Sequence, residues 1–339
     1  MSNLDHTKFL AKEAAHLSST IIEVNRLSKY FGNLKAVDEI SFSVNKGEIF
    51  GFLGPNGAGK TTTINMLTGL ARPSSGSIYI AGEDGIKNIK KVQQLIGIVP
   101  DESNLYDEMS GLENLIFCAS LYGLDKQKSE KRAKQLLAQF GLDNTGKRPF
   151  KAYSKGMKRK LTIAAGIIHQ PQILFLDEPT TGIDVESARQ IRQLLQELNH
   201  QGTTIFLTTH YIEEAERLCH RIGFIVKGKI VRIGQLSELM QDAQKDNIVE
   251  FTLETYCTEL QNALATEFPE TNVTKAEGEK IRISSPERIE LMPFMKFFAQ
   301  NQVPVYEARV IRPSLEDVFV KITGIELSEM KKEREGRKK

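Results

Sequence analysis

The sequence predicts an α/β domain with a helical insertion, followed by a small α+β domain, and three observations support this. Apolar strand patterns alternate with helical patterns in much of the first two thirds of the chain, which is typical of a parallel sheet. One strand runs through a glycine-rich stretch, Gly54 to Gly59, into a helix. After about residue 247 the patterns follow the order βαββαβ, which predicts a ferredoxin-like fold.

Length and composition exclude several classes of protein. The 339 residues suggest about two domains, and a chain with 40% hydrophobic and 26% charged residues is typical of folded globular proteins. No apolar run approaches the ~20 residues that a membrane span needs. The segment from Met1 to Thr20 lacks the apolar stretch of a signal peptide. We therefore expect a folded protein that is neither secreted nor membrane-spanning.

Charge argues against a nucleic-acid partner. The chain has 45 basic and 43 acidic residues, and its net charge of +2 is far from a strong basic excess. Six basic and two acidic residues lie between Lys331 and Lys339, so the remainder is slightly acidic, and we interpret this tail as a solvated end. The cysteines Cys118, Cys219 and Cys257 form no CxxC pair, which predicts neither a disulfide framework nor a zinc site and fits a reducing cytoplasm.

The first predicted elements surround the glycine-rich stretch. Ile40, Phe42 and Val44 alternate with polar residues, which is the period of a half-buried strand. The apolar segment Glu48–Leu53 is predicted as the strand before the glycines, and Thr61–Leu70 has the apolar spacing of a helix. Together these segments give the order strand, loop, helix.

A helical region interrupts this order from about residue 102 to residue 165. It contains the helical patterns Glu113–Tyr122 and Lys126–Phe140, each of which is followed by a glycine. Buried strands return at Ile173–Leu176 and Thr204–Thr208, on either side of the amphipathic helix Val185–Asn199. This βαβ order predicts parallel strand pairing.

We predict four segments along the chain: a leader over residues 1–20, a first domain over 21–240, a second domain over 247–324 and a charged tail over 325–339. The polar run from Gln241 to Asp246 separates the two domains. Pro293 predicts a kink or a restart in the second helix of the second domain. The elements expected there are the strand Ile248–Leu253, the helix Thr258–Phe268, a hairpin turning at Glu277 and Gly278, a helix ending near Gln300 and the strand Val303–Ile311.

The glycine-rich stretch has the spacing of a phosphate-binding loop between a strand and a helix. Backbone N–H groups and the helix amino terminus present positive charge to a polyphosphate, and glycines allow the backbone to approach it closely. Lys60 adds a full charge for the β- and γ-phosphates, and Thr61 can offer its hydroxyl to Mg²⁺. The predicted nucleotide-binding residues of this loop are Gly54, Pro55, Asn56, Gly57, Ala58, Gly59, Lys60, Thr61 and Thr62.

Two carboxylates follow the apolar strand Ile173–Leu176, at the strand end where ligands bind in open α/β sheets. We expect Asp177 to hold a metal ion or its water. Glu178 comes next and points the opposite way, so it can accept a proton from an attacking water molecule. With the phosphate-binding loop, these residues meet the needs of phosphoryl transfer to water.

From Ile21 to about Gly234 the chain resembles the nucleotide-binding subunits of ATP-binding cassette (ABC) transporters. The segment Tyr153-Ser154-Lys155-Gly156-Met157 is similar to the family's signature sequence, whose commonest form is LSGGQ. Ser154 and Gly156 are retained, and in the family these positions contact the γ-phosphate of a nucleotide held by the partner subunit. The resemblance implies a P-loop NTPase fold with a mixed sheet core, a helical subdomain and an antiparallel β subdomain.

Further site residues are assigned by the same resemblance. Thr180-Thr181-Gly182-Ile183-Asp184 resembles the D-loop that contacts the dimer partner, so we add Asp184 to the nucleotide-binding set. His210 falls where the family places its switch histidine. Phe31 fits the aromatic residue that stacks on adenine, with core packing of Phe31 or a shift of the assignment to Tyr30 as open alternatives. Ser154 also fits a helix N-cap, a role compatible with phosphate binding because both use free N–H groups.

The chain departs from the family at the Q-loop. Relatives usually carry glutamine after the proline, where this chain has Asp101 followed by Glu102. A carboxylate oxygen can bind Mg²⁺ or hold water, but it adds negative charge beside Asp177 and Glu178. We hypothesise that Asp101 takes the role of the glutamine. The predicted catalytic residues are then Lys60, Asp101, Glu178 and His210, and the predicted metal ligands are Thr61, Asp101 and Asp177.

The second domain indicates a branch of the family. Pro313-Ser314-Leu315-Glu316-Asp317-Val318-Phe319 and the run from His210 to Glu216 resemble cassette subunits of drug, polysaccharide or sodium exporters with a separate permease chain. The resemblance implies an ATPase that uses ATP and Mg²⁺ and pairs with a second ABC subunit, expected to be a copy of itself. It also implies that the subunit drives a membrane permease from the cytoplasmic face of the membrane, with the permease docking near Leu105–Phe150.

Two other functions stay open at this point. A soluble ABC ATPase acting on ribosome or DNA complexes would use the same hydrolysis. Such relatives generally carry two cassettes or a long coiled-coil insert, and this chain has neither feature and no basic face. A kinase would need an acceptor-substrate site and would have no use for a signature sequence. The sequence therefore favours the transporter subunit.

Overall fold

The computed structural model describes residues 20–243, 247–276, 278–311 and 314–324. Its contacts divide the chain into two units between Leu236 and Ser237, slightly before the boundary that we expected near residue 240. The predicted leader up to Ser19, the end of the polar run at Gln244 to Asp246, Glu277, Pro313 and the charged tail lie outside the described residues. Thr20 already belongs to the first strand.

The first unit is built on a six-stranded sheet with the strand order β10-β9-β3-β8-β7-β6. All its neighbouring pairs are parallel except β9 and β10, so the predicted parallel pairing is confirmed. Strands β6, β9 and β10 were not among the predicted elements. The strands are β3 (Ile49–Leu53), β6 (Ile96–Val99), β7 (Ile173–Asp177), β8 (Thr204–Thr209), β9 (Arg221–Val226) and β10 (Lys229–Gln235).

An antiparallel sheet with the order β2-β1-β4-β5 packs against this core. Phe42 of β2 stacks on Phe50 of β3 with 5.7 Å between ring centroids, and Phe206 of β8 lies 5.9 Å from Phe42. These rings belong to one buried cluster that joins the two sheets. The strands are β1 (Thr20–Phe31), β2 (Leu34–Asn45), β4 (Ser75–Ile80) and β5 (Glu83–Asp84).

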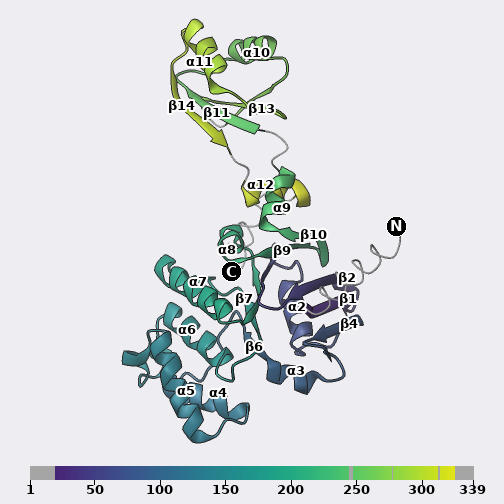
Figure 1. Ribbon diagram of the computed structural model, residues 1–339, viewed down its shortest axis with the longest axis vertical. Helices are drawn as coiled ribbons and strands as arrows, with labels where there is room; N and C mark the ends of the chain where they lie inside the picture. Colours follow the sequence, from purple (N-terminus) through teal and green to yellow (C-terminus); the bar gives the residue numbers. More distant parts are fainter. Residues whose placement is uncertain (1–19, 244–246, 277, 312–313, 325–339) are drawn as a thin grey trace, which may run out of the picture. The chain divides into compact units, whose positions relative to one another are not determined.

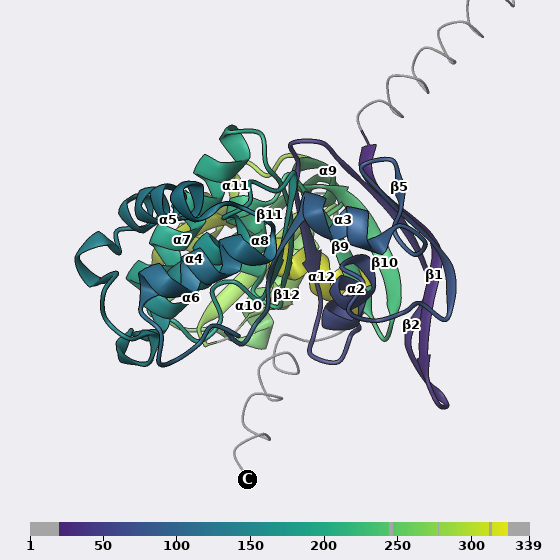
Figure 2. The same cartoon turned by 90° about the horizontal axis from the view of Figure 1, so that it is seen from below.

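The helical region forms a layer on one side of the first unit. In Figure 1 and Figure 2, α4 and α5 lie on the side away from β1 and β2. Ser110 begins α4 with a capping box in which Glu113 is the reciprocal partner. The helices of this unit are α2 (Lys60–Leu67), α3 (Ile89–Leu95), α4 (Gly111–Leu121), α5 (Lys126–Gln139), α6 (Lys155–Gly166), α7 (Val185–His200) and α8 (Ile212–Leu218), with short 3₁₀ turns at Asp143–Thr145 and Phe150–Ala152.

Helix α6 approaches strand β6 through two glycines. A Cβ at Gly97 would lie 2.1 Å from the carbonyl oxygen of Gly166, which is far inside van der Waals contact. A Cβ at Gly166 would lie 3.0 Å from Cγ2 of Val99. The strand that ends at Val99 and the helix that starts after Ser154 therefore have a fixed, close packing.

We predict that Gly97→Ala destabilises the first unit by about 1–3 kcal/mol, because the added methyl group must push α6 away from β6. The midpoint of chemical unfolding, followed by circular dichroism, measures this loss. An unchanged midpoint would show that the packing of α6 on β6 is looser than the contact between Gly97 and Gly166 indicates.

The second unit contains an antiparallel sheet with the order β12-β13-β11-β14. Its element order βαββαβ confirms the predicted ferredoxin-like fold, and Phe251, Ile281 and Phe298 lie in a separate buried cluster. Helices α9 and α12 precede and follow the sheet along the chain. The elements are α9 (Leu236–Ala243), β11 (Asn247–Leu253), α10 (Thr258–Glu267), β12 (Asn272–Lys275), β13 (Lys280–Ser285), α11 (Leu291–Gln300), β14 (Val305–Ile311) and α12 (Leu315–Thr323).

Pro293 does not interrupt its helix, contrary to our expectation of a kink or restart. Helix α11 begins at Leu291, so Pro293 is its third residue. The first four N–H groups of a helix have no partner within the helix, and a proline in the first turn therefore breaks no hydrogen bond.

No helix in the described parts of the chain has the length and the apolar character that crossing a bilayer requires.

Candidate functional site

The predicted phosphate-binding loop lies between β3 and α2. Gly59 precedes the helix with a φ angle of +104°, a conformation that glycine adopts without strain. A Cβ at this position would lie 2.5 Å from the carbonyl oxygen of Ala36, so the fold leaves room for glycine alone. The loop therefore leads directly into the amino terminus of α2, where unpaired N–H groups favour anions.

The Lys60 side chain folds back over this loop. It is only 6% exposed, and its Nζ donates hydrogen bonds to the carbonyl oxygens of Gly54 at 2.7 Å and Pro55 at 3.1 Å. The same Nζ lies 3.3 Å from Oε1 of Glu178. Lys60 thus joins the end of β3 to the end of β7, two strands that the sheet separates by β8.

Glu178 is held at the end of β7 in an uncommon backbone conformation. Its φ angle is +51°, which costs a non-glycine residue of order 1 kcal/mol or more. Its N–H donates to the carbonyl oxygen of Thr208 at 3.1 Å. The preceding Asp177 is buried and accepts a hydrogen bond from the Thr208 hydroxyl. Strand β8 therefore fixes the Asp177 carboxylate and the main chain of Glu178.

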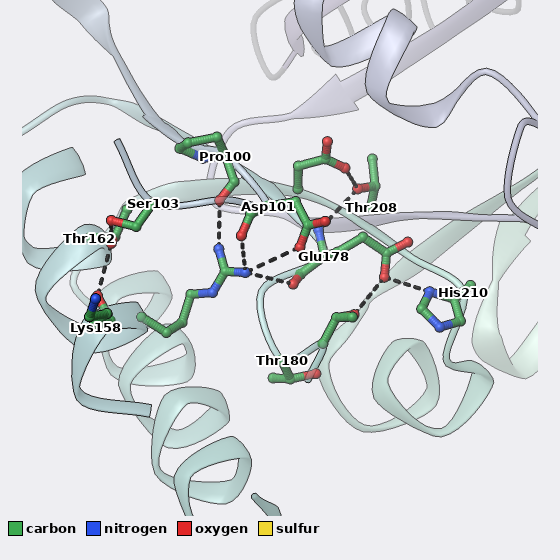
Figure 3. A network of polar contacts seen from close by, with 12 residues as sticks. Pro100, Asp101, Ser103, Lys158, Thr162, Glu178, Thr180, Thr208 and His210 are labelled. Atoms are coloured by element: carbon green, nitrogen blue, oxygen red, sulfur yellow. Dashed lines mark hydrogen bonds and ion pairs between the residues drawn. The ribbon is translucent and has the colours of Figure 1, made fainter. Parts of the chain in front are cut away.

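Three groups surround the Glu178 carboxylate. Besides Lys60, the Nδ1 of His210 lies 2.7 Å from Oε2, and the Thr181 hydroxyl donates to the same oxygen at 2.9 Å (Figure 3). Burial alone would raise the pKa of Glu178, but the hydrogen bond from His210 and the charge of Lys60 outweigh burial and lower it. The carboxylate is therefore ionised at neutral pH, and the Nδ1 of His210 is the donor.

His210 has one ring nitrogen without a partner. Its Nε2 is buried and makes no hydrogen bond to any part of the chain that the structure describes. Buried polar atoms normally have partners, so this nitrogen is available to a ligand. A protonated imidazole would donate from Nδ1 to Glu178 and from Nε2 to an anion at the same time.

Most of the predicted site residues line one open pocket at the loop. The Phe31 ring is 53% exposed and forms part of its wall, so Phe31 is not packed in the core. Three lining residues, Lys60, Glu178 and His210, form the ion-pair network just described. The lining residues are Phe31, Leu34, Lys35, Ala36, Asn56, Gly57, Gly59, Lys60, Thr61, Thr62, Asp101, Glu178, Thr181, His210 and Lys227.

Ser154, Gly156 and Asp184 do not line this pocket. Ser154 is exposed and caps α6, accepting a hydrogen bond from the N–H of Met157 at 3.3 Å. Asp184 caps α7 in the same way through the N–H of Ser187 at 2.8 Å. Gly156 is buried, and a Cβ there would lie 2.2 Å from the Ser187 hydroxyl. The structure therefore brings the two helix amino termini together, away from the loop of the same chain.

Asp101 lines the pocket, but an arginine that the sequence analysis did not identify holds it. Arg159 of α6 lies 3.3 Å from Oδ1 of Asp101 and also donates to its carbonyl oxygen at 2.6 Å. Burial raises the pKa of Asp101, Arg159 opposes this, and Asp177 and Glu178 add to it. The available signal was helical spacing, because Arg159 lies three residues after Gly156 and four residues before the apolar Ile163, on one face of α6.

Sequence comparison decides the family. Residues 37–181 match the family described as ABC transporter. The linearmycin resistance ATP-binding protein LnrL of Bacillus subtilis (strain 168) is 37% identical over 306 residues, which cover 90% of this chain and 98% of that protein. The chain belongs to the ABC transporter family. A doxorubicin resistance ATP-binding protein of Mycobacterium tuberculosis is also 37% identical, over 89% of this chain and 93% of its own length.

Other relatives of this ABC protein agree with that assignment. A Nod factor export ATP-binding protein of Ralstonia nicotianae is 35% identical over 91% of this chain and 96% of its own length. A solved ATP-binding subunit of an ABC transporter superposes with a TM-score of 0.61 at 30% identity, covering 66% of this chain and 94% of that one. A dimeric ATP-binding cassette bound to ADP and Pi has a TM-score of 0.60 at 25% identity, covering 64% and 99%.

The chain is an ATP-binding subunit of the exporter branch of the family, and it is an ATPase. The predicted P-loop fold with a helical subdomain and an antiparallel β subdomain is confirmed. The alternative of a soluble ATPase on ribosome or DNA complexes is not supported, because the similar proteins are ATP-binding subunits of transporters.

We predict that Lys60→Ala lowers ATP hydrolysis by about 100-fold or more, because a buried positive charge at the phosphates is lost. The fold should persist, since Glu178 keeps the donors His210 and Thr181. Phosphate release and far-UV circular dichroism measure the two effects.

Lys35→Ala is the matched control for this substitution. Lys35 also lines the pocket, but it is exposed and pairs with Asp38 at 3.6 Å, so we expect hydrolysis to change less than about threefold. Equal losses in both variants, or full activity in Lys60→Ala, would contradict the assignment of the site.

Proposed function

We propose that this subunit hydrolyses ATP between two copies of the chain and thereby drives export of a small molecule through a separate membrane permease. The observation that carries the proposal is the convergence of Lys60, Glu178 and His210 on one pocket at the amino terminus of α2. These groups supply a cation, a carboxylate base and an imidazole, which together meet the needs of phosphoryl transfer to water.

Each group has a distinct part in the proposed reaction. The loop N–H groups and Lys60 bind the β- and γ-phosphates, which compete with Glu178 for the lysine. The carboxylate that is released from Lys60 accepts a proton from the attacking water. His210 bridges Glu178 and the γ-phosphate through its two nitrogens, and the exposed Phe31 ring stacks on the base.

The oxygen donors beside the pocket fit a magnesium ion. Thr61 and Asp101 line the pocket, and Asp177 is a buried carboxylate held by the Thr208 hydroxyl. Mg²⁺ prefers such oxygen ligands and takes the rest of its shell from phosphate and water. We propose Thr61 and Asp177 as its protein ligands, with Asp101 close by. When bound, the ion neutralises negative charge on the phosphates.

The second copy of the chain would complete the nucleotide cage. Ser154 and Gly156 lie at the amino terminus of α6, away from the pocket of their own chain. This terminus has free N–H groups that can bind the γ-phosphate of a nucleotide held by a partner subunit. Asp184 caps the neighbouring helix α7 at the same surface. A homodimer therefore places two nucleotides between two identical surfaces.

The names of relatives support a proposal for the cargo. The names of three relatives refer to resistance to linearmycin, resistance to doxorubicin and export of Nod factor. We propose that the cargo here is likewise a small molecule and that a separate permease carries it. The subunit then acts on the cytoplasmic face of the membrane and needs no nucleic-acid partner.

Glu178→Gln tests the proposed reaction. We expect the variant to bind MgATP and to accumulate as an ATP-bridged dimer, because the amide cannot accept the proton from water. Steady-state phosphate release should fall by about 10²–10⁴-fold. Size-exclusion chromatography with ATP and a phosphate assay measure both effects.

Glu213→Gln is the control, since Glu213 is exposed on α8 and contacts Arg217 at 3.7 Å. We expect its phosphate release to stay within about twofold of wild type. Wild-type phosphate release from Glu178→Gln would refute the role of Glu178 as the base, and a monomer at saturating ATP would refute the dimer.

A further inference from the structure

One buried arginine connects three parts of the site. Arg159 lies in the second turn of α6, the helix that Ser154 caps, and it is only 7% exposed. Its guanidinium donates to the carbonyl oxygens of Pro100 at 2.6 Å, Asp101 at 2.6 Å and Glu178 at 3.4 Å (Figure 3). Two nitrogens of the planar guanidinium make these contacts, one with Pro100 and the other with Asp101 and Glu178, and the single nitrogen of a lysine cannot take both positions.

The segments that Arg159 joins come from two adjacent strands. Pro100 and Asp101 follow β6, Glu178 follows β7, and these strands are parallel neighbours. A second link ties the segment after β6 to α6, because the hydroxyls of Ser103 and Thr162 lie 2.8 Å apart. A displacement of α6 would therefore move Asp101 and the main chain of Glu178 with it.

Arg159 also compensates the negative charge of Asp101. The carboxylates of Asp101, Asp177 and Glu178 lie at one end of the sheet. Their negative charges repel one another and would also repel an anionic ligand. The guanidinium lies 3.3 Å from Oδ1 of Asp101 and is buried, whereas the Asp101 side chain is 53% exposed, so solvent screens this ion pair from one side only. A neutral side chain at position 101 would not need this partner.

We propose that Arg159 is a positioning residue for ATP hydrolysis, which neutralises Asp101 and holds Asp101 and the Glu178 main chain in a fixed relation to α6. This inference rests on the proposed function of the site. Arg159 acts through these two residues and does not itself touch the nucleotide.

A double-mutant cycle tests the proposal with wild type, Arg159→Gln, Asp101→Asn and the double variant. We expect Arg159→Gln to lower kcat by about tenfold or more, because an unpaired carboxylate then lies beside Glu178. The double variant should hydrolyse ATP about threefold or more faster than Arg159→Gln, because no carboxylate is left to compensate. A double variant as slow as Arg159→Gln, or slower, would overturn the proposal.

The affinity for nucleotide in the absence of metal ions is a second measurement. If Arg159 only stabilised the fold, its substitution would leave the ratio of the ATP and ADP affinities unchanged. A fluorescent analogue of ATP and one of ADP are titrated in the presence of EDTA. Arg159→Gln should raise the Kd for ATP relative to that for ADP by about threefold, because the extra γ-phosphate meets the unpaired Asp101. Asp101→Asn in the same chain should restore the ratio, and an unchanged ratio in Arg159→Gln would contradict the charge compensation.

Two further variants keep the test decisive. Lys158→Gln removes a neighbouring positive charge of α6 that pairs with Asp107 at 3.3 Å, and we expect kcat to change less than about twofold. If Arg159→Gln does not fold, as thermal unfolding would show, Arg159→Lys replaces it and should lower kcat by about threefold, because one ammonium nitrogen cannot take the positions of two guanidinium nitrogens. An unchanged kcat in Arg159→Lys would overturn the proposal. A wild-type chain that neither binds nor hydrolyses ATP would instead refute the proposed function.

Discussion

The ion pair between Lys60 and Glu178 is the interaction on which the site depends. Both side chains are largely buried, and a buried charge that loses its partner costs several kcal/mol. Lys60 must therefore face an anion at all times, either the Glu178 carboxylate or a phosphate at the loop. The binding of the triphosphate therefore affects the position of the proposed base. When the Lys60 ammonium group approaches a phosphate, its interaction with the Glu178 carboxylate becomes weaker.

The residues around this ion pair connect the helical layer to the end of the sheet where Glu178 lies. Glu178 has a strained backbone, its N–H bonds to β8, and its carbonyl oxygen accepts from Arg159 of α6. Helix α6 in turn packs on β6 through Gly97 and Gly166 without room for a methyl group. Through Arg159, the helix that presents Ser154 at its exposed end thus contacts the main chain of Glu178, the proposed base. A partner subunit that displaces α6 would therefore displace the main chain of Glu178.

Local patterns were sufficient to predict the parts of this site that depend on neighbours in the sequence. The phosphate-binding loop, the strand before Asp177 and the ferredoxin-like order of the second unit all follow from spacing within about ten residues. Strand β6 was missed because it follows α3 directly, with no glycine or proline between the two elements. Arg159 was missed because it lies between Lys158 and Lys160, where a charge run suggests a solvated surface, and because its partners are 58 and 59 residues away. Tertiary packing likewise brings Lys60 and His210 to Glu178, whereas the third donor, Thr181, is only three residues away in the sequence.

The most direct test of the account is a crystal structure of the wild-type chain with a non-hydrolysable ATP analogue. The quantity to measure is the distance from the Lys60 Nζ to the Glu178 carboxylate, which is 3.3 Å here. The account predicts that Nζ moves to a phosphate oxygen and that the carboxylate lies more than about 4 Å away, beyond the range of an ion pair. A bound triphosphate with Lys60 still paired to Glu178 would contradict it.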